Sequence, residues 1–266
     1  MVSKIHNLRA YTFVLFFNLY GLKLSLVTVV YNAQDTIGQC IESVISQNYQ
    51  NLEYIIVDGG STDNTLQIIN QYRSRINILI SEPDKGIYDA MNKGIKLATG
   101  QIVGTLNADD HFADHEVLLS IAKVFEQQDI DAVYGDLDII NQHHQIIRKW
   151  CSGQCKSSSF NLGFMPPHPT FYCRRNLFEK FGFYSLEYGS AADYELMLRF
   201  IHLYKIRSFY LKKVMVKMRV GGISSKNLKN RKKAWAFDLK AMRKNKIMFP
   251  LLALMLKPLR KIIQFI

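Results

Sequence analysis

The sequence predicts an α/β protein built on a mostly parallel, doubly wound sheet. Five short apolar runs recur between residues 24 and 136, and stretches with apolar residues three and four positions apart separate them. Continuous apolar runs indicate strands buried on both faces, which is how helices cover a parallel sheet. The 266 residues, 48% of them hydrophobic, are enough to bury a sizeable core.

The elements follow one another in regular alternation up to residue 136. We expect strands at 24–30, 53–58, 76–81, 101–107 and 131–136, and helices at 35–47, 64–75, 86–98 and 116–127. Beyond that point the pattern predicts a hairpin arm at 136–150, a proline-rich loop at 160–175, and helices at 176–181 and 191–204. Residues 226–266 are basic and helical in pattern, with interruptions at Pro250 and Pro258.

The net charge of +12 is concentrated in the C-terminal quarter. From Arg199 onward, 19 Lys and Arg stand against one acid, Asp238, whereas residues 1–198 carry 15 basic and 21 acidic side chains. Four cysteines are too few for a disulfide framework and fit reduced thiols in a cytosolic compartment. Cys151 and Cys155 lack the two further ligands that a zinc site needs.

Residues 10–22 form a strongly apolar stretch behind Lys4 and Arg9. The stretch is too short to span a bilayer comfortably, and no small-residue cleavage pattern follows it. A membrane-touching segment, an extra packed element and an over-long start all remain open. The first core strand is expected directly after it, at 24–30.

Polar residues directly follow each predicted parallel strand. Ligands of such sheets bind beyond these carboxyl ends of the strands. The polar residues include the adjacent Asp109 and Asp110 at the end of "GQIVGTLNADDHF". A solvated turn is one interpretation, since Asn and Asp favour turns. The other is a divalent cation, which would offset the repulsion between neighbouring carboxylates. The convergence of Asp58, Asp84 and Lys85 on the same edge favours a ligand site.

A phosphate-bearing ligand would have to be held by side chains and a metal. The sequence has no Gly-x-Gly-x-x-Gly after the first strand and no Walker loop. Asp carboxylates can take one or two positions around Mg²⁺ or Mn²⁺ and leave the others to phosphate and water. Asp109 is the expected metal ligand.

At this level of detail the chain resembles the family 2 glycosyltransferases of the GT-A fold, particularly bacterial enzymes of surface-polysaccharide assembly. The resemblance covers roughly residues 24–225. It rests on five ordered pieces: "SLVTVVYNAQDTIGQCIESVISQ", "EYIIVDGGSTDNT", "SEPDKGIYDAMNKGIKLATGQIVGTLNADD", "HPTFYCRR" and "AADYELMLR". It implies a nucleotide-sugar half (24–136), an acceptor half (137–225), an N-terminal extension (1–23) and a basic helical tail (226–266).

The resemblance also implies roles for single residues. Asp58 matches the aspartate that hydrogen-bonds the nucleotide base, and "NADD" matches the Asp-x-Asp metal motif, with Asp109 meeting the cation. Asn107 replaces the first aspartate and would contact ribose or a metal-bound water. For Asp110 two roles stay open, a helper at the cation site or a cap for the segment that follows. The other implied nucleotide-sugar contacts are Thr28, Tyr31, Asn32, Asp84, Lys85 and Gly86.

Asp193 matches the family's catalytic base, although Ala192 replaces the preceding glutamate. The implied reaction is direct displacement with inversion, in which Asp193 takes the proton of an acceptor hydroxyl. The alternative is that Asp193 only caps its helix. His168 resembles the acceptor-side loop and would touch the leaving phosphate or the acceptor, unless it is a packing residue. No Gln-x-x-Arg-Trp motif is present, so one sugar per visit is expected, and 219–225 resembles the family's flexible loop.

The basic tail predicts contact with an anionic membrane surface. Nucleic acid would account for the charge but not for "FPLLALML", which needs apolar burial. We therefore expect a protein in the cytoplasm, peripheral to the inner face of the cell membrane, acting on a glycan or polyprenyl-linked acceptor. The alternative is a helix packed on the catalytic domain with a solvated basic side.

Two other functions compete with the transferase. A sugar nucleotidyltransferase would need a Gly-rich, Arg-containing loop after the first strand, and "VVYNAQDT" is not one. A catalytically impaired sugar-nucleotide or membrane-binding protein stays open because of Asn107 and Ala192.

Overall fold

The computed structural model describes residues 21–220, 228–262 and 264. The apolar stretch at 10–22 therefore lies almost entirely outside the described residues. The same holds for most of the loop expected at 219–225.

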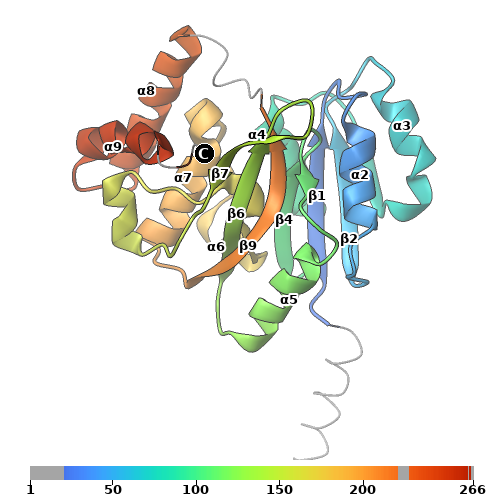
Figure 1. Cartoon of the computed structure of the whole chain (residues 1–266), viewed down its shortest axis with the longest axis horizontal. Coiled ribbons are helices and arrows are strands. Elements are labelled where there is room, and N and C mark those ends of the chain that lie inside the picture. The colour runs from blue at the N-terminus through green and yellow to red at the C-terminus, as the bar shows by residue number, and fades with distance from the viewer. Residues whose placement is uncertain (1–20, 221–227, 263, 265–266) are drawn as a thin grey trace, which may run out of the picture.

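The first half of the chain forms the parallel part of one nine-stranded sheet (Figure 1). Its strands, β1 (Leu24–Val30), β2 (Leu52–Asp58), β3 (Ile78–Ser81) and β4 (Ile102–Asn107), stand in the order β3-β2-β1-β4. Val30 is paired with Asp58, and Asp58 with Ser81, so the carboxyl ends of these strands lie level. The predicted strands and their convergence on one edge are confirmed.

The second half extends the same sheet with antiparallel and parallel pairs. Its strands are β5 (His111–Phe112), β6 (Ala132–Ile140), β7 (Ile146–Trp150), β8 (Tyr172–Arg174) and β9 (Ser208–Arg219). β8 is inserted antiparallel between β4 and β6, β9 runs parallel to β6, and β7 forms the predicted hairpin arm with β6. The boundary expected at residue 136 falls inside β6.

Strand β9 has no counterpart among the predicted elements. Lys212, Lys213 and Lys217 interrupt its apolar pattern, and only Met215 and Val216 among its twelve residues are buried. It nevertheless pairs with β6 along most of its length and with β5 at its end. The strand is stabilised by this pairing rather than by an apolar run, so its sequence carries little strand signal.

Helices cover both faces of the sheet, as the fold class requires. One face packs against α2 (Ile37–Ile45), α3 (Thr65–Gln71) and α5 (Val117–Gln127). The other packs against α4 (Ile87–Leu97), α6 (Asn176–Phe181) and α7 (Ala192–Met197). Successive β1 residues alternate between the two cores, Leu26 in the first and Val27 in the second.

Short helical turns fill the connections. They are η1 (Arg73–Arg75), η2 (Ser157–Leu162), η3 (His168–Thr170), η4 (Leu186–Ala191) and η5 (Leu198–Leu203). η5 is a π-helical continuation of α7, so together they form the helix predicted at 191–204.

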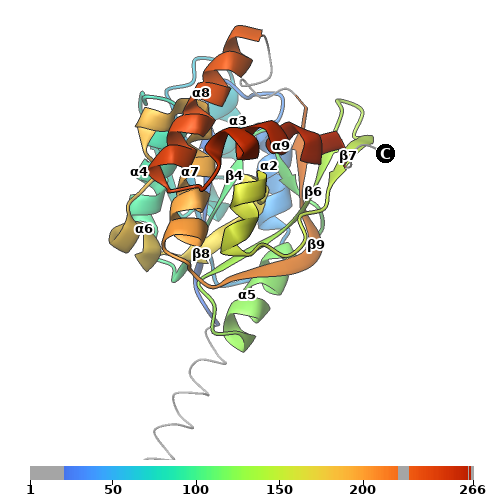
Figure 2. The same ribbon diagram turned by 90° about the vertical axis from the view of Figure 1, so that its left-hand side faces the viewer.

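The C-terminal tail forms two helices, α8 (Leu228–Lys244) and α9 (Pro250–Ile262), beside α7 on one side of the molecule (Figures 1 and 2). Pro250 begins α9, whereas Pro258 lies inside it without ending it. Within the described residues, no helix has the length and apolar character needed to cross a bilayer.

Candidate active site

The loops that follow β1 and β2 are hydrogen-bonded to each other at the carboxyl ends of the strands. The Asn32 Oδ1 atom accepts a hydrogen bond of 2.8 Å from the Thr62 amide, and the Asn32 amide donates one of 2.8 Å to Ser61 Oγ. Asn32 adopts a φ of 47°, which Asn tolerates better than most residues. Beside it, 63% of the Tyr31 side chain is exposed. The pair therefore presents an aromatic ring on a fixed loop.

Asp58 is fully buried at the end of β2 and holds its own loop. Its carboxylate accepts hydrogen bonds from the Gly60 amide (3.2 Å), the Ser61 amide (3.1 Å), the Ser61 hydroxyl and the Ser81 hydroxyl (2.7 Å). A direct contact with a nucleotide base would require one of these hydroxyls to turn away.

Thr28 is also fully buried, and its Oγ1 accepts a hydrogen bond of 3.2 Å from the Tyr54 hydroxyl. This leaves it no exposed surface for a ligand, in contrast to the predicted contact. Both faces of β1 are covered by helices, and position 28 falls on the same face as Leu26 and Val30, within the core under α2, α3 and α5.

Asp84 lies across the edge from these loops, at the start of α4. A Cβ atom added to Gly59 would come 2.4 Å from Asp84 Oδ2, so only glycine fits there. Asp84 Oδ1 accepts a hydrogen bond of 2.7 Å from the Gly86 amide, and Gly86 adopts a φ of 109° that favours glycine. Lys85 between them is exposed. These residues lie at the edge where a nucleotide sugar is expected.

The "NADD" segment forms the turn that one of the two interpretations predicts, and its side chains remain candidates for the other, a cation site. The backbone makes a turn, in which the Asp110 amide donates to the Asn107 carbonyl oxygen at 3.0 Å. Asp109 is exposed, whereas Asp110 is buried, and Asn107 Nδ2 donates to Asp110 Oδ2 at 3.3 Å. Burial, and then the charge of Asp109, hold the pKa of Asp110 well above its usual range.

Two oxygens of this segment are buried without a hydrogen-bond partner, Asn107 Oδ1 and Asp110 Oδ1. Buried acceptors are costly when unsatisfied. A cation would satisfy them and would lower the pKa of Asp110. Together with the exposed Asp109 carboxylate they form an all-oxygen donor set, which suits Mg²⁺ or Mn²⁺. The residues present therefore fit such a cation.

The donor set is small. The described residues contain no cluster of three or more His, Cys, Asp or Glu side chains that could enclose a metal ion. A cation at "NADD" would thus keep open positions for phosphate oxygens and water, which is the usual arrangement for Mg²⁺.

His168 and Asp193 form a pair next to this segment. His168 Nδ1 lies 3.1 Å from Asp193 Oδ2, and the Tyr194 amide donates to Asp193 Oδ1 at 2.7 Å. Tyr88, from the first turn of α4, lies near the same carboxyl group: burial first, and then the charge of Asp193, raise the pKa of the Tyr88 hydroxyl. Asp193 does not cap α7, which begins at Ala192 without a side-chain cap. The capping interpretation of Asp193 is therefore wrong.

Each side chain of the pair shifts the pKa of the other. Burial alone would raise the pKa of Asp193, but the charge of His168 and its hydrogen bond lower it below the usual value. Burial would likewise lower the pKa of His168, but Asp193 first, and then Asp110 and Asp109, raise it. His168 therefore connects the Asp193 carboxylate electrostatically to the "NADD" segment.

A comparison with protein-family models decides the family. The model described as "Glycosyl transferase family 2" matches residues 25–185, more than half of the chain. The chain belongs to glycosyltransferase family 2. A curated relative of this glycosyltransferase is the "PGL/p-HBAD biosynthesis glycosyltransferase" of Mycobacterium bovis (strain BCG / Pasteur 1173P2). It is 31% identical over 184 residues, which are 66% of this chain and 68% of that protein.

Solved structures confirm the GT-A fold of this glycosyltransferase. S. aureus TarS 1-349 in complex with UDP-GlcNAc aligns with a TM-score of 0.68 at 20% identity, over 84% of this chain and 66% of that one. The mannosyltransferase PcManGT from Pyrobaculum calidifontis, in complex with GDP-Man and Mn²⁺, aligns with a TM-score of 0.65 at 17% identity, over 90% and 73%. This chain spans 39% of a longer TarS structure.

Sequence reasoning missed two contributors to the glycosyltransferase site. Tyr88 is not among the predicted site residues, yet it lies close enough to Asp193 for the charge of that carboxylate to raise the pKa of its hydroxyl. Ser81 was not singled out, although it donates to Asp58. Its place at the end of β3, level with Asp58, is the signal that could have identified it.

Proposed function

We propose that this family 2 glycosyltransferase is an inverting, metal-dependent and non-processive enzyme. It would move one sugar per visit from a nucleoside-diphosphate sugar to its acceptor. The observation that carries the proposal is the His168–Asp193 pair beside the Asp109–Asp110 carboxylates. The pair supplies a general base, and the carboxylates supply a cation site, within one edge of the sheet.

The donor would lie across the carboxyl ends of β1, β2 and β4. Tyr31, Asn32 and Asp84 border the nucleotide, and Asp58 acts by fixing the loop at Gly60 and Ser61. Lys85 and Gly86 would lie near the donor sugar. The UDP-GlcNAc and GDP-Man complexes of the two structural neighbours support a nucleotide sugar as donor class.

Asp109 would bind the cation, with Asp110 and Asn107 below it. When bound, Mg²⁺ or Mn²⁺ would supply positive charge against the diphosphate that leaves. His168 faces the same region and carries a raised pKa, so its imidazolium form adds to that charge.

Asp193 would act as the base. Its lowered pKa keeps it ionised at neutral pH. It accepts the proton of the acceptor hydroxyl as that oxygen bonds to the anomeric carbon, while the bond from that carbon to the diphosphate oxygen breaks with its electron pair. His168 holds the carboxylate in place during this step.

The acceptor would be a glycan or a polyprenyl-linked saccharide, in the synthesis of a cell-surface polysaccharide such as lipopolysaccharide or exopolysaccharide. The basic tail at 226–266 supports a location in the cytoplasm at the inner face of the cell membrane. Residues 24–136 would hold the donor and 137–225 the acceptor.

A catalytically impaired binding protein is the second candidate, favoured by Asn107 and Ala192. Ala192 is fully buried, so this position contributes to packing in the present fold. The impaired protein would bind a nucleotide sugar without turning it over.

A thermal-shift screen of UDP-, GDP- and dTDP-sugars, with and without Mn²⁺, tests the proposal. One donor class should raise the melting temperature, and Mn²⁺ should increase that shift. Asp109→Asn should lose the Mn²⁺-dependent part, whereas the exposed control Glu179→Gln should keep it. Donor binding that ignores both Mn²⁺ and EDTA would contradict the metal site. The anomeric configuration of the product, read by NMR, tests inversion.

A further inference from the structure

The outer face of α9 exposes an unusual set of large apolar side chains. Six of them are 47–70% exposed: Met248, Phe249, Leu251, Leu252, Met255 and Leu259. Single exposed apolar residues need no explanation, but a contiguous group usually marks a contact surface. We call these six residues the α9 face.

The spacing of the α9 face shows that it is one side of a helix. Leu251, Leu252, Met255 and Leu259 follow the i, i+1, i+4, i+8 pattern, while Ala253 on the other side is fully buried. Because its buried side already packs on the domain, the α9 face is a second apolar surface, which residues 21–220 and 228–262 leave uncovered.

The helix is held firmly against the catalytic domain. Lys257 Nζ lies 2.8 Å from Asp238 Oδ2 in α8 and 3.6 Å from the ring centroid of Tyr194 in α7. A Cβ atom added to Gly163 would come 2.6 Å from the Ala253 carbonyl oxygen, so η2 and α9 are in backbone contact. A packed helix therefore presents the α9 face outward, and Figure 2 shows this helix on the outside of the molecule.

Basic residues accompany the α9 face. Arg243 and Lys244 are exposed in the last turn of α8, directly before the connection that carries Met248 and Phe249. Arg260 is exposed at the other end of the face. Residues 226–266 as a whole contain twelve Lys and Arg and one acid, which the Asp238–Lys257 ion pair already uses.

We propose that the α9 face is the docking surface of this protein for a bilayer containing anionic lipids. Apolar side chains would enter the boundary between headgroups and acyl chains, and the surrounding Lys and Arg would contact lipid phosphates. With 13 residues, α9 is about 20 Å long, too short for a hydrocarbon core of about 30 Å, so it lies in the surface.

Other occupants fit less well. A second copy packed through the same face would bring two strongly basic surfaces together, and nucleic acid would leave the apolar side chains uncovered. An anionic bilayer is complementary to both features.

Docking would also fix the position of the active site relative to the bilayer. Tyr194, which Lys257 of α9 contacts, is the neighbour of Asp193, so the bilayer would stand at a fixed position relative to the proposed base. This step rests on the proposed function. It favours the lipid-linked acceptor over a free saccharide.

Flotation with lipid vesicles tests the docking surface without any catalysis. The full chain should float with phosphatidylcholine vesicles that contain phosphatidylglycerol, and at least about tenfold less with phosphatidylcholine alone. Leu251→Ser/Leu252→Ser should abolish flotation, and Arg243→Gln/Lys244→Gln should weaken it on anionic vesicles. The control Leu97→Ser/Tyr204→Ser changes two exposed apolar residues on other elements and should float like the unaltered protein.

Two results would overturn the proposal. One is equal flotation of the unaltered and Leu251→Ser/Leu252→Ser proteins, with unchanged melting temperatures. The other is a dimer, detected by analytical ultracentrifugation, that the same substitutions dissociate, since it would assign the α9 face to a second copy. Neither result affects the nucleotide-sugar screen, so failure here is distinguishable from failure of the proposed function.

Discussion

His168 Nδ1 lies 3.1 Å from Asp193 Oδ2, and this contact joins η3 to α7 at the edge of the sheet. In the chain these two segments are separated by β8, α6 and η4. The charge of each partner shifts the pKa of the other, so the contact has a measurable pH signature.

Replacing His168 by Gln should move the acid limb of kcat/KM to higher pH. His168 lowers the pKa of Asp193, so its removal raises that pKa, and the base becomes protonated at a higher pH. The measurement is the pH profile of transfer. His115→Gln, at an exposed histidine near Ser46, serves as the control and should leave the profile unchanged. If the acid limb of the kcat/KM profile stays at the same pH in His168→Gln, Asp193 is not the group whose protonation limits the reaction.

Replacing Asp110 by Asn should stabilise the metal-free protein at pH 7 by about 1 kcal/mol. The pKa of Asp110 is raised in the folded state, so ionisation costs stability as the pH rises above the unfolded value. The same change should reduce the thermal shift given by Mn²⁺. Asp109→Asn, at the exposed neighbour, should reduce the Mn²⁺ shift with little effect on the metal-free protein. Loss of stability in Asp110→Asn without metal would contradict this account of the segment.

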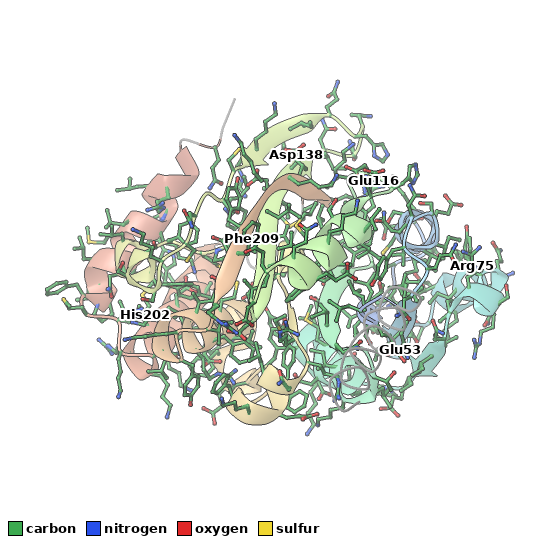
Figure 3. All side chains as sticks on the ribbon, turned by 90° about the horizontal axis from the view of Figure 1, so that it is seen from below. Glu53, Arg75, Glu116, Asp138, His202 and Phe209 are labelled. Atoms are coloured by element: carbon green, nitrogen blue, oxygen red, sulfur yellow. The ribbon has the colours of Figure 1, made fainter. Side chains whose placement is uncertain are left out.

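Replacing Glu53 by Gln should destabilise the protein at neutral pH by about 2 kcal/mol. Glu53 lies on the lower side of the molecule (Figure 3) and accepts hydrogen bonds from Lys23 (2.7 Å), Ser25 (2.5 Å) and the Thr99 amide (2.7 Å). Burial opposes ionisation, but these donors lower the pKa of Glu53 to about 2.

The pH dependence of this stability difference tests whether it arises from the charge of Glu53. Because the pKa of Glu53 is lower in the folded than in the unfolded protein, its ionised form stabilises the fold at pH values above the unfolded pKa of 4.5. This stabilisation is lost as the pH falls toward the folded pKa of about 2. Denaturant unfolding of both proteins between pH 7 and pH 2 should therefore show the difference shrinking at acid pH. A difference independent of pH would exclude this ionic origin.

Replacing Lys257 by Met should lower the free energy of unfolding by about 3 kcal/mol. The change leaves Asp238 largely buried without its partner, since both side chains of the pair are at most 15% exposed. Lys257→Met/Asp238→Leu should recover much of the loss, because no uncompensated charge remains. Denaturant unfolding measures both, and a double variant no more stable than the single one would argue against the ion pair as the cause.

Much of the sheet could be predicted because strands buried on both faces have a distinctive apolar pattern. The convergence of Asp58, Asp84 and Asp109 on one edge followed from the parallel topology of β1 to β4. β9 escaped prediction because its pairing with β6 supplies the stability that an apolar run would otherwise signal.

The candidate site residues follow from their positions in the sequence, but their environments do not. The burial of Asp58 by Ser61 and Ser81, and the proximity of Tyr88 to Asp193, depend on loops from separate strands meeting in space. The same holds for the tail, whose helices both pack on α7 and expose the α9 face. The sequence pattern alone could not reveal that the tail both packs on the domain and exposes an apolar surface.

The central claim is that Asp193 is the base of a sugar transfer. The most direct measurement compares sugar transfer and donor binding in the unaltered protein, Asp193→Asn and the control Glu179→Gln, using the donor that the thermal-shift screen selects. We predict that Asp193→Asn keeps its donor-induced thermal shift but loses transfer by about 100-fold or more, while Glu179→Gln keeps both. Unchanged turnover in Asp193→Asn would contradict the account.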